Sequence, residues 1–256
     1  MAKKDFSEIF PAAPEYGSGM ARRRIRLTGA PGQVLGELED HAHGMRCLIQ
    51  HDGHVVTAVT SEFRRIPMNT CLGAGEPLQA LVGTPIGCDF GTFYRDGRAR
   101  MNCTHMFDIA WLATAHAARG ETVRTYDVEV PDEVDGASDV RLLRDGEVLL
   151  RWSIRNSIVE APQALAGQHL FRGFTTWALA HLDGDDLEAA LVLQKGCFVA
   201  QARRWTIVPG PISAEEKVAN VGVCHGFGRA RIEGAERLDD TKRDFTDHPE
   251  RLLKFL

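Results

Sequence analysis

The chain has 256 residues, of which 44% are hydrophobic and 25% are charged, and its formal net charge at pH 7 is −5. These values are ordinary for a globular protein and permit a sizeable core. The acidic balance excludes a dedicated nucleic-acid role, because that role requires a basic face. No apolar run approaches the roughly 18 residues that a membrane span needs, so we expect no membrane partner.

The cysteines predict a reducing environment. There are six of them, with no Cys-x-x-Cys pair, and no secretory signal follows the first four residues. We therefore expect reduced thiols and a cytoplasmic location.

Residues 1–20 predict a flexible N-terminal arm, because prolines and glycines interrupt any periodic pattern there. Residues 21–256 are expected to form a single domain with possible halves at 21–120 and 121–256. No linker-like stretch separates these halves.

The pattern from residue 22 to residue 60 predicts an antiparallel meander with one buried face. Alternating apolar positions indicate strands over 25–27 and 34–40, and Asp52-Gly53 predicts a hairpin turn before a last strand over 55–60. One face of the third strand is expected to carry His41, His43, Met45, Cys47 and Ile49.

A long helix over 104–119 is the clearest element of the chain. Its apolar residues recur at helical spacing, and Gly120 follows as a stop signal. A helix-compatible piece over 75–82 and an irregular, glycine-rich segment over 85–100 precede it.

A second set of strands and helices follows Gly120. Strands are predicted over 122–130, 140–143 and 148–154, helices over 168–181 and 186–201, and a helix start with capping-box form at 213–216. The order of elements indicates an α+β fold, in which antiparallel sheets pack against helices and two similar halves enclose one pocket.

Cys103 and His105 are the first candidates for chemistry. They lie where the long helix begins, and a helix N-terminus tends to lower the pKa of a thiol and to keep an imidazole neutral. Asp108 follows one turn later and could orient the His105 ring. The alternative is a buried thiol next to a capping imidazole.

His43 is expected to meet His105 in a common pocket, because the buried face of the third strand needs a helix to cover it. Cys103 or Cys71 should lie close by. The alternative is that His41 and His43 are ordinary core histidines. A third alternative is a zinc site made of Cys71, Cys103, His105 and His43, although this spacing is unlike compact zinc motifs.

No phosphate-binding loop, dinucleotide fingerprint or His-Glu-x-x-His motif is present. We therefore predict no cofactor and no metal.

Several short segments carry a resemblance to a bacterial family known mainly as a domain of unknown function. They are Leu38-Glu39-Asp40, His43-Gly44-Met45, Pro67 to Cys71, Leu81-Val82-Gly83 and Asn102-Cys103-Thr104-His105-Met106. Their order and spacing fit over roughly residues 20–120. The last segment is similar to a Gly-Cys-Thr-His-Leu signature, with Asn102 and Met106 as departures. The resemblance implies an association with the breakdown of aromatic, lignin-derived compounds.

The resemblance implies an enzyme of aromatic-compound catabolism. The histidines predict cofactor-independent acid–base chemistry, as in a lyase that cleaves a C–C or C–O bond, for example by deformylation. The expected catalytic residues are His43, His105, Tyr126 and Cys103, and the expected residues that contact the aromatic substrate are His41, Met45, Asp108, Trp111 and Cys71. His43 would be the base, His105 the electrophilic or acid partner, and Tyr126 would bind or protonate a phenolate.

Two alternatives stay open: a hydrolase with Cys103 as nucleophile, and a non-catalytic protein that binds a small molecule or zinc. A homodimer or other homo-oligomer is expected for each of these functions.

Overall fold

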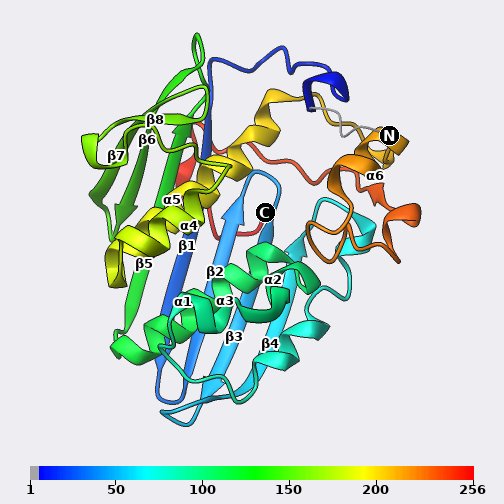
Figure 1. The fold of residues 1–256 in the computed structure, drawn as a ribbon. Coiled ribbons are helices and arrows are strands. Elements are labelled where there is room, and N and C mark those ends of the chain that lie inside the picture. Colours follow the sequence, from blue (N-terminus) through cyan, green and yellow to red (C-terminus); the bar gives the residue numbers. More distant parts are fainter. Residues whose placement is uncertain (1–5) are drawn as a thin grey trace.

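A computed structural model describes residues 6–256 (Figure 1). Its main feature is one antiparallel sheet of eight strands in the order β4-β3-β2-β1-β5-β6-β7-β8. The strands are β1 (Met20–Ala30), β2 (Gln33–Asp40), β3 (Gly44–His51), β4 (Val56–Arg65), β5 (Val123–Pro131), β6 (Ala137–Arg144), β7 (Glu147–Arg155) and β8 (Ile158–Ala161). A separate pair consists of β9 (Gly210–Pro211) and β10 (Glu236–Arg237).

The helices complete an α+β fold, as the sequence predicts. The α-helices are α1 (Phe90–Phe93), α2 (Arg98–Met101), α3 (Thr104–Arg119), α4 (Phe174–His181), α5 (Gly184–Ala200) and α6 (Ala214–Asn220). Short 3-10 helices cover Phe6–Glu8, Asn69–Cys71, Glu76–Leu81, Arg95–Gly97, Gln163–Leu165, Gln201–Arg204, Ile232–Gly234 and Pro249–Arg251.

The two predicted strand sets form a single sheet. Each set is a four-stranded meander followed by a long helix, and the two meanders join where β1 pairs with β5. The register that places Arg23 opposite Asp40 on β2 also places it opposite Val128 on β5. The two halves therefore share one continuous buried face instead of closing on each other.

Helices α3 and α5 cover the same face of the sheet (Figure 1). Two glycines allow the close approach. A Cβ on Gly36 of β2 would lie 2.3 Å from Cγ2 of Ile109 in α3, and a Cβ on Gly196 of α5 would lie 2.4 Å from Cγ1 of Val128 in β5. In each half, the missing side chain lets a helix backbone or an apolar side chain sit directly on the sheet.

The opposite face of the sheet carries a ladder of ion pairs. Arg24 lies directly opposite Asp127, and Arg26 lies opposite Glu37, so the charges meet across neighbouring strands. Such cross-strand pairs stabilise a half-exposed face modestly. The alternation of arginines with Ile25 and Leu27 thus separates a polar face from a buried one.

The N-terminal and C-terminal segments both pack on the domain. In the described part of the N-terminal segment, Ala12 bridges to Trp205 and Ala13 is buried, while residues 1–5 lie outside the described residues. The flexibility of the arm stays a prediction. At the other end, the backbone N–H groups of Leu253 and Phe255 donate to the buried carboxylate of Glu39 on β2. These two hydrogen bonds hold the end of the chain against β2.

None of the helices over residues 6–256 combines the length and the apolar character that crossing a membrane would require.

Candidate functional site

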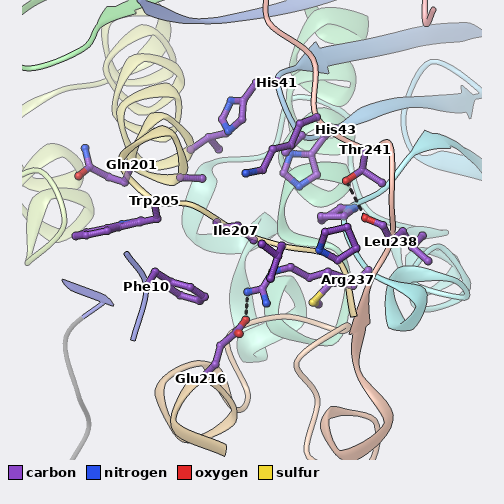
Figure 2. Close-up of a pocket in the computed structure, with 18 of the residues that line it drawn as sticks. Phe10, His41, His43, Gln201, Trp205, Ile207, Glu216, Arg237, Leu238 and Thr241 are labelled. Carbon is purple, nitrogen blue, oxygen red and sulfur yellow. Dashed lines mark hydrogen bonds and ion pairs between the residues drawn. The ribbon is translucent and has the colours of Figure 1, made fainter. Parts of the chain in front are cut away.

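A cavity of about 470 Å³ opens at one end of the sheet, where the β2–β3 turn meets the start of α3. Its other walls come from the end of α5, the segment 201–209 and the segment 237–242, which follows from the end of β10. No strand of the second meander lines the cavity, so it is not the pocket enclosed between two facing halves that the sequence predicts. Figure 2 shows His41 and His43 at one end of this cavity and Glu216 with Arg237 at the other.

His43 is positioned by a turn that Asp40 organises. The carboxylate oxygen Oδ1 of Asp40 accepts hydrogen bonds from the backbone N–H groups of Ala42 and His43, at 2.9 and 2.8 Å. The same oxygen lies 3.0 Å from Nδ1 of His43. Because an aspartate that caps its own turn competes with strand pairing, β3 begins at Gly44 and not at His41 as predicted. The Asp40 contact fixes the proton on Nδ1 and leaves Nε2 as the basic atom.

Arg23 holds Asp40 from the other side. Its Nη1 donates to Oδ2 of Asp40 over 3.0 Å, and both side chains are buried. Burial by itself would raise the pKa of Asp40, but the charge and hydrogen bond of His43, and then the charge of Arg23, hold this pKa well below its usual range. Asp40 is therefore a carboxylate that can stabilise a positive charge on His43.

The ring of His105 contacts the ring of His43 at a tilted angle inside the cavity. The two ring centroids lie 4.3 Å apart, with an angle of 52° between the ring planes. Burial, followed by the positive charges of His43 and Arg23, lowers the pKa of His105 well below its ordinary value. A neutral imidazole thus sits in contact with one that is paired to a carboxylate, which is an arrangement suited to proton transfer.

His41 lines the cavity beside this pair. It is 6% exposed, and neither ring nitrogen has a hydrogen-bond partner among the described residues. Burial lowers the pKa of His41 to about 4, so the ring is neutral near pH 7.

The rest of the cavity wall is mainly apolar and aromatic. Phe10, Trp205 and Phe227 contribute rings, and Ile207 and Met68 contribute aliphatic surface. Aromatic walls with a few polar groups are typical of sites for small organic ligands.

The predicted cysteines do not form a nucleophilic centre in this cavity. Cys103 precedes the first residue of α3, as expected, but burial raises the pKa of its thiol to about 12, and burial has the same effect on Cys71. Here burial raises the pKa of the Cys103 thiol by more than the predicted effect of the helix N-terminus lowers it. Neither thiol lines the cavity.

Tyr126 lies outside the cavity, against α5. Its hydroxyl donates to Glu188 over 2.5 Å and accepts from Arg124 over 3.1 Å. The ring is fully buried, so no substrate contact is open to it. The predicted phenolate-binding role therefore does not fit the structure.

Three further predicted contact residues, Asp108, Trp111 and Met45, do not line this cavity. Asp108 accepts a hydrogen bond of 2.5 Å from the hydroxyl of Tyr94 and pairs with Lys195, so it does not orient His105. Asp108 and Trp111 line a different, small cavity of about 20 Å³ between α3 and α5, and Met45 is part of the core. Asp108 follows His105 by about one helical turn, which suggested that the two side chains could meet. The Asp108 side chain instead faces α5, where it pairs with Lys195.

The four residues of the alternative zinc site are not gathered around one point. Over residues 6–256, no three or more His, Cys, Asp or Glu side chains are arranged to hold a metal ion. His43 and His105 face each other in the cavity, whereas neither Cys71 nor Cys103 lines it.

Two residues of the site, Asp40 and Arg23, are not among those that the sequence predicts. The alternation of side chains along β1 was the signal that could have identified Arg23. Arg23 shares the buried face of the strand with Ile25 and Leu27, and a buried arginine requires a carboxylate partner.

Residues 28–119 match the model of a family described as a protein of unknown function, DUF2889. This agrees with the resemblance to a domain-of-unknown-function family. The matched segment contains Asp40, His43 and His105, but not Arg23 or the walls of the cavity after α5. No curated protein matches the chain.

Proposed function

We propose that the protein is a cofactor-independent lyase that uses acid–base chemistry on an aromatic small molecule. The observation that carries the proposal is the contact between His43 and His105 at the end of an aromatic-lined cavity, with His43 held by the buried pair of Asp40 and Arg23. The resemblance to proteins associated with aromatic catabolism supplies the substrate class.

The proposed bond cleavage needs a single base, which is His43. Nε2 of His43 takes the hydroxyl proton of a substituent such as a hydroxymethyl group. The C–C bond to that group then breaks, its electrons move into the conjugated aromatic portion, and the small fragment leaves as an aldehyde. The imidazolium of His43, stabilised by Asp40, returns the proton to the product. No electron acceptor is needed. The N–H of neutral His105 donates to the oxygen on which negative charge develops.

Screening with phenolic dimers and aromatic acids that carry a hydroxymethyl group tests the proposal, with released formaldehyde as the readout. His43→Gln and His105→Gln should each lower the rate by roughly 10²–10⁴ while ligand affinity changes little. His54→Gln, at the exposed tip of the β3–β4 hairpin, is the matched control and should retain the wild-type rate. Wild-type rates in both cavity variants would overturn the assignment.

A binding protein without catalysis is the second candidate, because the cavity by itself suits a small ligand. In that case the histidine variants would change affinity modestly, and no turnover of any bound compound would be detected.

A further inference from the structure

The end of the cavity opposite the histidines holds a buried ion pair. The Glu216 carboxylate binds the guanidinium of Arg237, and their side chains are 2% and 16% exposed. Both residues line the cavity, and Figure 2 shows the pair below Phe10 and Ile207, away from His43. Arg237 also lies over the ring of Phe10, 5.1 Å from its centroid.

The local sequence does not require this pair. Ser213 caps α6 by accepting a hydrogen bond from the N–H of Glu216, but the Glu216 carboxylate does not return to the cap as a capping box predicts. It turns to Arg237 in β10 instead. A buried ion pair contributes little net stability, because desolvation offsets the attraction. A functional use of the pair is therefore the better explanation.

The pair also retains hydrogen-bonding capacity. Among the described residues, the side chains use only Oε1 of Glu216 and Nη2 of Arg237 for each other, and neither has another side-chain hydrogen bond. The second carboxylate oxygen can accept, and the remaining guanidinium N–H groups can donate. A ligand group that donates and accepts at once can use both.

We propose that Glu216 and Arg237 form a subsite for the hydroxyl of a phenolic ring stacked between Phe10 and Trp205. The hydroxyl donates to Glu216 and accepts from Arg237. A carboxylate would place a second anion beside buried Glu216, and an ammonium group would place a second cation beside Arg237. This subsite deepens the proposed function, because it would fix the aromatic ring while the reacting substituent points to His43.

Equilibrium binding of three biphenyl probes, followed by tryptophan fluorescence, tests the subsite on the full chain. They are 4-phenylphenol, 4-methoxybiphenyl and biphenyl-4-carboxylate. The phenol should bind at least about tenfold more tightly than the ether, which cannot donate, and than the acid. Glu216→Gln removes the negative charge and should reverse the preference in favour of the acid. Glu236→Gln, on the same strand as Arg237 but outside the cavity, is the control and should keep the wild-type order.

Equal affinity for the three probes, or an unchanged order in Glu216→Gln, would overturn the subsite. Loss of turnover in the histidine variants would then still support the lyase proposal, so the two failures are distinguishable. If the reversal occurs but both histidine variants keep wild-type turnover, the subsite stands and the catalytic assignment fails.

Discussion

The imidazole rings of His43 and His105 lie 4.3 Å apart, although one belongs to a turn after β2 and the other to the first turn of α3. Their different surroundings separate their roles. His43 shares a hydrogen bond with the carboxylate of Asp40, whereas the pKa of His105 is lowered by burial and by its neighbours. One ring is prepared to accept a proton and the other to remain neutral.

Replacing Asp40 should destabilise the fold as well as disturb the site. Asp40→Asn removes the only carboxylate that Arg23 contacts in the described residues and leaves a buried guanidinium unpaired. The free energy of unfolding should fall by about 3 kcal/mol, measured by urea denaturation. Asp247→Asn, at an exposed position, should leave it unchanged. A decrease under about 1 kcal/mol would show that the pair is not a buried one in solution.

Stability should decrease in mild acid because of His41. In the unfolded chain this imidazole takes up a proton near its ordinary pKa of 6.5, but burial lowers the folded value to about 4. The unfolded state therefore binds more protons between these values, and stability is lost as the pH falls through that window. The loss between about pH 7 and pH 5 should reach about 2 kcal/mol for this residue. The lowered pKa of His105 acts in the same direction.

His41→Phe provides the check on that pH dependence. It removes the titrating group and the two buried, unpartnered nitrogens. The urea midpoint of the variant should therefore change less with pH than that of the wild type, and at pH 7 it should be no lower than that of the wild type. If the wild type and the variant show the same slope between about pH 7 and pH 5, His41 is not the group responsible.

A methyl group at Gly36 should separate α3 from the sheet. The new Cβ would lie 2.3 Å from Ile109, so helix and strand must move apart, at a cost of about 1–3 kcal/mol in unfolding free energy. Gly234→Ala is the matched control, because no atom lies within 4 Å of a Cβ there. Its effect should stay within about 0.5 kcal/mol. Similar midpoints for both variants would contradict the close helix–sheet contact.

Cys103 should react slowly with iodoacetamide in the folded protein. Its thiol has a pKa near 12 because it is buried, so the thiolate is scarce near neutral pH. Peptide mapping should find Cys103 modified quickly only after unfolding in urea, and Cys103→Ala should keep the activity of the wild type. Rapid modification of the native protein, prevented by a bound ligand, would instead favour the Cys103 hydrolase.

Local pattern alone determined several features of this protein. The two-residue alternation in β1 and β5, the 104–119 helix with Gly120 at its end, and the α+β class all follow from the spacing of apolar residues, because side-chain direction repeats with backbone geometry. The same local reasoning placed His43 and His105 toward each other.

Only the tertiary structure decided what the remaining groups do. Whether Arg23 meets solvent or Asp40, whether Tyr126 faces the cavity or Glu188, and whether Cys103 is ionisable all depend on segments far away in the chain. Burial set these outcomes: it shields the Cys103 thiol from the expected effect of the helix N-terminus and requires a charged partner for Arg23. The spacing along β1 could place Arg23 on the buried face, but desolvation is a property of the packed interior, so spacing could not identify the partner of Arg23 or the state of the Cys103 thiol.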